Sequence, residues 1–402
     1  MTSFELSRDH EDFRHVVRDF AEAQIAPHVA RWDKERHFPT DVVHQMGELG
    51  LFGLTAPEEY GGSGGDFTSL CVAIEEIGRV DQSMGITLEA AVGLGINPIL
   101  TYGTDAQKQT WLPDLVAGQR LAGFGLTEPG AGSDAGATRT KAELVDGAVG
   151  VEWLINGAKQ FITNSGSTIT SLVTVTAKTG TRPDGRPEIS AIIVPSGTPG
   201  FVAEPGYDKL GWHISDTHPL SFTDCRVPEE NLLGERGRGF AQFLAILDDG
   251  RVAISALAVG LIQACLDECL RYAKDRQTMG GPIGRKQGVA FQIADLEVML
   301  QASRMLTYRA AAMRDAMLSP SLRSGAPSVA EFKQAAAVAK LYSSESAVSA
   351  TRIATQVFGG YGFMEEYPVA RFYRDAKILE IGEGTSEVQR MLIARSLGLP
   401  VE

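Results

Sequence analysis

Two segments of the chain combine residue types that could do chemistry. Residues 125–137 are small residues and hydroxyls, with Thr127 and Ser133 among them. Such a run lets backbone N–H groups approach a flat polar ligand closely, although the same composition fits a glycine-rich surface loop. The second segment holds Glu383 between two glycines. Missing side chains on both flanks would let the backbone present this carboxylate tightly against a substrate.

A plainer interpretation of Glu383 starts from the residues that follow it. A helix is expected to begin near Ser386, with Gln389 completing a capping box. Acidic residues are favoured near a helix N-terminus by the helix dipole. The residue types alone therefore leave both a catalytic and a capping role open.

Three stretches of different periodicity must position these segments. Apolar residues recur at helical spacing through the first part of the chain, for example between Asp12 and Val29. The glycine-rich run at residues 60–66 is predicted to be a loop, since it follows no strand and lacks the Lys-Ser/Thr ending of a phosphate cradle. This part predicts an all-α domain at residues 1–120.

The middle of the chain has the pattern of short strands. Asp146-Gly147, Asn156-Gly157 and Pro183-Asp184-Gly185 separate runs rich in β-branched residues, and each suits a tight turn. We expect a central β domain at residues 121–235. After it the helical period returns, and a polar loop near residues 319–328 divides two long helices. Residues 236–402 are therefore expected to form a helical bundle, which makes the fold class α+β.

Composition excludes several classes of function. The 402 residues are 44% hydrophobic and 22% charged, as in soluble globular chains, and the formal net charge of −13 argues against a nucleic-acid partner. The apolar run at residues 252–266 is shorter than the ~20 residues that span a bilayer, so we expect a buried helix and no membrane. The N-terminus has neither a basic start nor an apolar core, which favours bacterial cytoplasm. The four scattered cysteines are expected to be reduced, with no metal site.

Three motifs together carry a family resemblance. Residues 125–137, residues 356–363 (QVFGGYGF) and the stretch from 373–377 (YRDAK) to 383–387 (EGTSE) resemble signatures of the acyl-CoA dehydrogenase family, over essentially the whole chain. The run 247–251 (LDDGR) is similar to the short-chain and branched-chain group. The resemblance implies an N-terminal helical domain, a small β-barrel or sandwich, a C-terminal four-helix bundle, and FAD as cofactor.

The resemblance also implies which residues contact FAD. Thr127 and Thr163 would hydrogen-bond or assist at the flavin ring, and Phe161 would cover a ring face where many relatives have tryptophan. Arg276 and Gln287 match residues that contact the FAD of a neighbouring subunit. Arginine suits this task because its planar guanidinium can bind two phosphate oxygens at once. The implied cofactor-binding set is Phe124, Leu126, Thr127, Gly132, Ser133, Phe161, Thr163, Arg276, Gln287, Gln356, Gly359, Gly360, Thr385 and Glu387.

For catalysis the resemblance implies that Glu383 removes the α-proton of an acyl-CoA thioester while the flavin accepts the β-hydrogen, giving a trans-2-enoyl-CoA. Burial should raise the pKa of Glu383 toward neutrality, which suits a base working near pH 7. The implied substrate-binding residues are Ser133, Asp248, Arg251 and Gly384. A surface salt bridge is the alternative for the Asp248 and Arg251 pair.

Three positions depart from common family patterns. Gly382 stands where many straight-chain relatives carry tyrosine, so we expect tolerance of an α-branched or bulkier acyl group. Gly250 occupies an alternative base position and leaves Glu383 without a competitor. Glu89 lies near where the family closes the acyl pocket, and it could limit chain length, pair with a polar substrate or lie on the surface.

Partners and rival functions complete the expectations. The family implies a homotetramer, a dimer of dimers, and an electron-transferring flavoprotein as acceptor. The alternatives are an acyl-CoA oxidase, a monooxygenase of the same superfamily, a DNA-associated flavoprotein and a catalytically silent flavin-binding scaffold. The acidic balance disfavours the DNA-associated protein, and the intact carboxylate at position 383 disfavours the monooxygenase.

Overall fold

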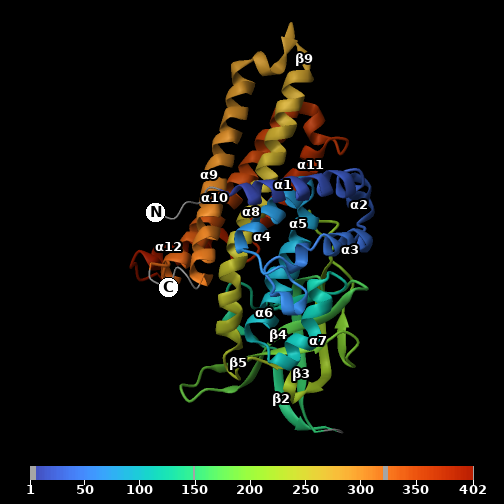
Figure 1. The fold of residues 1–402 in the computed structure, drawn as a ribbon, viewed down its shortest axis with the longest axis vertical. Helices are drawn as coiled ribbons and strands as arrows, with labels where there is room; N and C mark the ends of the chain where they lie inside the picture. Colours follow the sequence, from blue (N-terminus) through green and yellow to red (C-terminus); the bar gives the residue numbers. More distant parts are fainter. Residues whose placement is uncertain (1–5, 148–149, 320–324, 402) are drawn as a thin grey trace.

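The computed structural model describes residues 6–147, 150–319 and 325–401. Figure 1 shows helices crossing the middle of the molecule, a sheet at one end, and long helices projecting to the other end. The first helices are α1 (Arg8–Phe20), α2 (Val29–Glu35), α3 (Thr40–Glu48), α4 (Phe67–Val80), α5 (Gln82–Glu89), α6 (Asn97–Tyr102) and α7 (Asp105–Val116). Two π-helical segments, η1 (Ala21–Ile25) and η4 (Ala90–Ile96), interrupt them. The predicted loop at residues 60–66 is confirmed, and Asp66 caps α4 by accepting a hydrogen bond from the Ser69 N–H.

The strands form one curved sheet of eight, in the order β6-β7-β3-β2-β4-β5-β8, with β1 paired in parallel to β4. Their bounds are β1 (Leu121–Gly125), β2 (Lys141–Asp146), β3 (Val151–Thr163), β4 (Thr170–Thr181), β5 (Pro187–Pro195), β6 (Phe201–Ala203), β7 (Thr217–Pro228) and β8 (Leu232–Leu233). One face encloses a small core around Trp153 and Phe222, while Leu172 and Ile193 belong to the main core shared with the helices.

Two of the three predicted turns are correct, and one is wrong. Asp146-Gly147 lies between β2 and β3, and Pro183-Asp184-Gly185 lies between β4 and β5, both antiparallel pairs. Asn156-Gly157 instead lies inside β3, where the pairing with β7 shifts register. Gly157 has φ +153°, and a Cβ there would meet the Thr140 hydroxyl at 2.5 Å. The glycine is therefore required because the chain at Thr140 approaches β3 closely, and not because β3 turns at this point.

The last third of the chain is helical, as predicted. Its helices are α8 (Gly239–Asp275), α9 (Gln287–Leu318), α10 (Val329–Phe358), α11 (Pro368–Ala376) and α12 (Ser386–Ser396), with the short hairpin β9 (Gln277–Thr278) and β10 (Gly281–Pro282) between α8 and α9. The predicted loop separates α9 from α10, although residues 320–324 lie outside the described part. Its end is fixed by Ser328 and Glu331, which cap α10 reciprocally.

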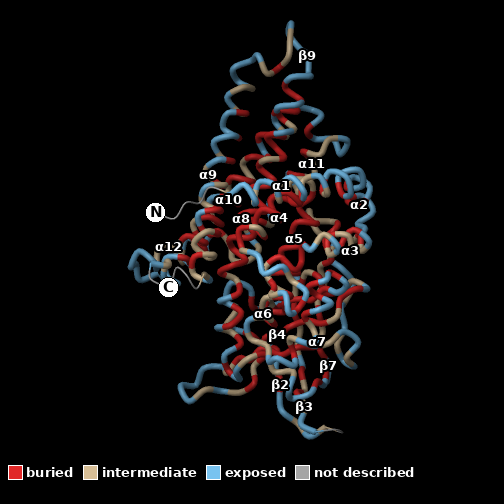
Figure 2. Tube along the Cα trace, in the orientation of Figure 1, coloured by how far each residue is buried: buried red, intermediate tan, exposed pale blue. Residues whose placement is uncertain are grey.

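The main core runs through the middle of the molecule. Figure 2 shows buried stretches concentrated in α4, α5, α8 and α10, and exposed ones at the β2–β3 and β9 tips. Among the described residues, two helices are long and apolar enough to cross a membrane, Gln82–Tyr102 and α8, but 72% and 83% of their most apolar windows are buried within the protein. The predicted buried helix is thus part of α8, and all four cysteines are free and buried.

Candidate active site

Glu383 lies on a strained loop between η10 (Lys377–Glu380) and α12. Its φ is +51°, which is uncommon for a residue with a side chain, and Gly384 follows at +97°. The loop is held at the Gly384 carbonyl, which accepts hydrogen bonds from Lys340 Nζ at 2.8 Å and Gln389 Nε2 at 2.9 Å. Thr385 caps α12 by accepting from the Val388 N–H. The helix starts where predicted, but Gln389 supports the carbonyl of the loop and forms no capping box.

The Glu383 carboxylate packs against α8 at a glycine. Both of its oxygens are inaccessible to solvent, and apart from the neighbouring Glu89 carboxyl no protein group among the described residues is placed to satisfy them. A Cβ at Gly250 would lie 2.0 Å from Glu383 Oε2, so any side chain there would displace the carboxylate. Gly250 therefore leaves the space that Glu383 occupies.

A second carboxyl faces Glu383 from the end of α5. Glu89 is fully buried, which excludes the surface position that the sequence left open. Burial and the charge of Glu383 raise the pKa of Glu89 well above its ordinary value. Burial also raises the pKa of Glu383, to about 6, although a hydrogen bond from Glu89 and the charges of Lys340 and Arg251 oppose the rise. Glu89 is therefore the harder of the two carboxyls to ionise, and Glu383 loses its proton first as the pH rises.

The Asp248 and Arg251 pair is also buried, so the surface alternative is wrong. The two side chains, only 8% exposed each, form an ion pair one turn apart on α8, and Lys333 reaches Asp248 Oδ2 at 3.2 Å. Arg251 Nε has no partner among the described residues. The charge of Arg251 acts on Glu383, so the structure brings this predicted substrate contact to the base.

On the sheet, the glycine-rich segment and Phe161 are held side by side. The Gln160 N–H donates to the Thr127 carbonyl at 2.8 Å. Phe161 has φ +62° at a register shift of β3, and its ring, tilted on Tyr207, is 62% exposed. An exposed aromatic face beside an accessible run of small residues fits a flat ring such as flavin. Gly132 and Ser133 are exposed on the same loop, whereas Leu126 is buried and the Phe124 ring stacks on Phe243 in the core.

A buried ion pair that sequence reasoning missed anchors this loop. Lys159 Nζ donates to Glu128 Oε1 at 2.8 Å and to the Leu126 carbonyl at 3.3 Å. Burial raises the pKa of Glu128, but the charge of Lys159 outweighs this and holds it at about 2. Burial lowers the pKa of Lys159 to about 8. The sequence signal for this pair is weak: an acid within the loop, and a lysine two residues after Gly157 in the strand.

The remaining predicted FAD contacts lie elsewhere. Arg276 ends α8, where its guanidinium lies 5.6 Å from the centre of the Tyr361 ring, and Gln287 begins α9. Gln356, Gly359 and Gly360 are exposed at the end of α10. Thr385 and Glu387 line a shallow pocket at the start of α12. The β9 tip and the sheet occupy opposite ends of the molecule (Figure 1), so one chain does not bring its two sets of predicted contacts together.

Comparison with known proteins gives the family. Sequence models described as the N-terminal, middle and C-terminal domains of acyl-CoA dehydrogenase match residues 7–119, 123–225 and 237–398. The probable acyl-CoA dehydrogenase YngJ of Bacillus subtilis is 47% identical over 98% of this chain and 99% of its own.

Solved structures agree with the sequence matches. Butyryl-CoA dehydrogenase from Megasphaera elsdenii is similar with a TM-score of 0.90 at 40% identity, covering 98% of this chain and 99% of its own. An acyl-CoA dehydrogenase from Bacillus anthracis, solved complexed with FAD, is similar with a TM-score of 0.90 at 33% identity, covering all of this chain and 70% of its own.

Proposed function

The chain belongs to the acyl-CoA dehydrogenase family with FAD as its cofactor, and from this premise we propose that it dehydrogenates a short-chain acyl-CoA across its α and β carbons with Glu383 as base. The observation that carries the proposal is the buried Glu383 carboxylate, which among the described residues forms no ion pair and has only the Glu89 carboxyl placed to satisfy it. A desolvated carboxylate whose pKa is raised to about 6 is well suited to take a weakly acidic proton near pH 7.

Other residues would bind the flavin and the substrate while Glu383 acts as the base. Thr127, Thr163 and Phe161 would hold the flavin ring, which when bound accepts the β-hydrogen as hydride. Glu383 receives the α-proton on a carboxylate oxygen, and its backbone N–H would donate to the thioester carbonyl as charge develops there. Ser133, Asp248 and Arg251 would bind the CoA arm, and Gly384 stays a predicted substrate contact.

The acyl group is proposed to be short and to include α-branched chains. The similarity to a butyryl-CoA dehydrogenase supports a short chain. In the described part of the chain, the atom nearest to a Cβ at Gly382 would be the Ile378 carbonyl oxygen at 3.4 Å, so the position has room that a larger side chain would fill. That space supports the branched-chain expectation.

We also propose a homo-oligomer, as a dimer of dimers. The FAD contacts at Arg276, Gln287 and the end of α10 would then serve the cofactor of a partner subunit, since they lie far from the sheet of their own chain (Figure 1). Phe291, Val298 and Met305 repeat every seventh residue along α9 and are each more than half exposed, which supports an interface. An electron-transferring flavoprotein is the proposed acceptor and the cytoplasm the proposed location. The division at residues 1–120, 121–235 and 236–402 stays a prediction.

The direct test is the anaerobic visible spectrum of the FAD-loaded protein, before and after adding butyryl-, isobutyryl-, 2-methylbutyryl- or octanoyl-CoA. We expect one of the short or branched thioesters to bleach the flavin. Glu383→Gln should keep FAD and lose the bleaching rate by about 10²- to 10⁴-fold, because an amide accepts no proton. Glu152→Gln on β3, paired with Arg226, is the control and should bleach normally. Bleaching by Glu383→Gln at the normal rate would overturn the proposal.

A further inference from the structure

Lys340 is buried beside the base without any part in the proposed chemistry. It lies on α10 and is fully buried, although an ammonium is costly to remove from water. Its one hydrogen bond recorded among the described residues goes to the Gly384 carbonyl, at 2.8 Å. A methionine would fill the same volume without the desolvation cost, so the charge itself needs an explanation.

The backbone that Lys340 contacts is strained. Glu383 holds a left-handed φ of +51°, and such a conformation persists only where its surroundings over-determine it. Two buried donors meet at the Gly384 carbonyl, Lys340 from α10 and Gln389 from α12. A Cβ at Gly384 would lie 2.7 Å from Gln389 Nε2, so the loop and both donors fit closely.

We propose that Lys340 is a positioning residue, whose ammonium holds the Gly384 carbonyl and thereby aims the Glu383 carboxylate at the α-carbon of the acyl group. The inference rests on the proposed function of Glu383. Gln389 already supplies a neutral donor to the same carbonyl, so what Lys340 adds is positive charge.

The charge acts on groups from several elements. Glu383 on the loop, Glu380 on η10 and Glu345 on α10 favour the charged form of Lys340, while Arg251 on α8 opposes it. Glu383 in turn faces Lys340, Arg251 and Glu89. Burial lowers the pKa of Lys340 to about 8, so the ammonium is present at pH 6, where Glu383 titrates.

Two variants separate the charge from the hydrogen bond. Lys340→Met removes both, whereas Gln389→Met removes only the neutral donor to the same carbonyl. The measured quantity is the rate of flavin bleaching at low acyl-CoA concentration between pH 5 and 8, in FAD-loaded protein. At pH 8 we expect both variants to lose about tenfold, because the carboxylate is less well aimed.

At pH 6 Lys340→Met should lose about a further tenfold, as its acid limb moves to higher pH, and Gln389→Met should lose no more than at pH 8. Equal losses at both pH values in the two variants, or no loss in Lys340→Met, would overturn the inference. Lys340→Gln keeps a donor without charge and serves if the methionine variant does not fold. A wild-type protein that no acyl-CoA bleaches would instead defeat the proposed function.

Discussion

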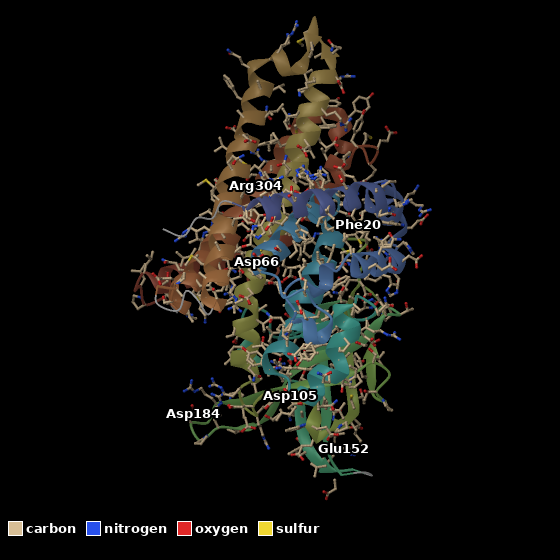
Figure 3. All side chains as sticks on the ribbon, viewed as in Figure 1. Phe20, Asp66, Asp105, Glu152, Asp184 and Arg304 are labelled. Atoms are coloured by element: carbon tan, nitrogen blue, oxygen red, sulfur yellow. The ribbon has the colours of Figure 1, made fainter. Side chains whose placement is uncertain are left out.

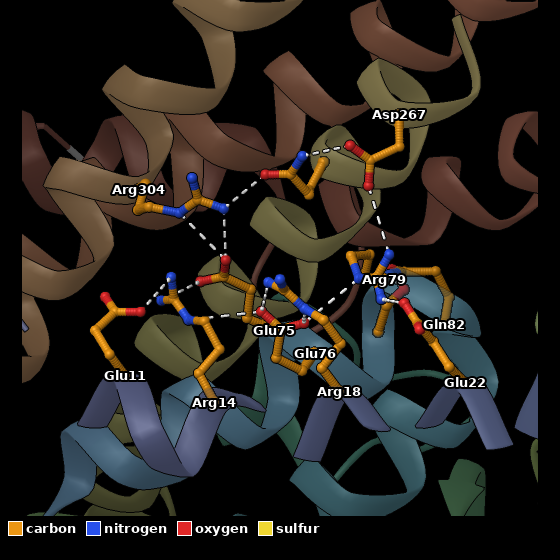
Figure 4. A network of polar contacts seen from close by, with 12 residues as sticks. Glu11, Arg14, Arg18, Glu22, Glu75, Glu76, Arg79, Gln82, Asp267 and Arg304 are labelled. Carbon is orange, nitrogen blue, oxygen red and sulfur yellow. Dashed lines mark hydrogen bonds and ion pairs between the residues drawn. The ribbon is translucent and has the colours of Figure 1, made fainter. Parts of the chain in front are cut away.

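Glu75 and Glu383 both hold buried carboxylates, but the protein surrounds them differently. Glu75 on α4 accepts from Arg304 Nη2 at 2.6 Å and from the Tyr308 hydroxyl at 2.6 Å, and Arg14 lies 3.7 Å away. Figure 4 shows it inside a network that joins α1, α4, α8 and α9. Among the residues that the structure describes, no arginine or tyrosine donates to Glu383. Figure 3 shows that Arg304, a partner of Glu75, lies in the helical part of the molecule, whereas Glu152 lies at the far end of the β-sheet.

The pKa values follow these surroundings. Burial raises the pKa of Glu75, but the charges of Arg304 and Arg14 outweigh it and bring the pKa below its ordinary value. Burial of Glu383 is not outweighed, and its pKa stays raised, at about 6. The first carboxylate is kept ionised to join helices, and the second is poised to take up a proton.

The largest expected effect is on stability, at Glu75. Glu75→Gln leaves two arginines partly unpaired in a buried site, which typically costs about 3–5 kcal/mol. Urea unfolding of the FAD-loaded protein should show this as a lowered midpoint, while folded protein still bleaches with butyryl-CoA. Glu297→Gln on the exposed side of α9 is the control. An unchanged midpoint in Glu75→Gln would remove the distinction between the two glutamates.

Displacing the Glu383 carboxylate should lower the activity and change the stability of the protein little. Gly250→Ala places a methyl group where Glu383 Oε2 now lies, so the carboxylate must move. A misplacement of about 1 Å can cost 10²-fold, and we expect that loss in the bleaching rate. Gly288→Ala on α9 meets nothing within 4 Å and should leave the rate unchanged. Equal rates in the two alanine variants would show that Gly250 does not shape the base.

The smallest effect concerns the acyl group. Gly382→Tyr should fill space beside the base and reduce the ratio of isobutyryl-CoA to butyryl-CoA activity by about tenfold or more, since one methyl group in a pocket is worth about 10- to 200-fold. The ratio of kcat/KM values measures it, with FAD content as the check on folding. An unchanged ratio would mean that position 382 does not set the breadth of the pocket.

Sequence alone predicted the helical, strand and helical order, because periodicity reports burial directly. The motif around Glu383 and its two flanking glycines also predicted this residue as the candidate base. The Asn156-Gly157 turn was wrong because a strand that another backbone approaches closely also demands glycine. Lys159 and Lys340 were missed because a lysine in a strand or helix normally lies on the surface, and only tertiary packing shows where these two lie.

The role of Gln389 was mistaken for a similar reason. A Gln three or four residues into a helix is typical of a capping box, and only the path of the preceding loop shows that its amide reaches the Gly384 carbonyl. The sequence left the location of Glu89 open because its burial depends on how α5 packs against the loop that carries Glu383.

The most direct test of the central claim is the pH dependence of flavin bleaching in the wild-type protein at low butyryl-CoA concentration, which reports groups of the free enzyme. The buried carboxylate of Glu383 predicts a rate that falls tenfold for each pH unit below an apparent pKa of about 6. A rate that stays constant down to pH 5 would contradict the account, since Glu383 would then be an ordinary ionised carboxylate or not the base.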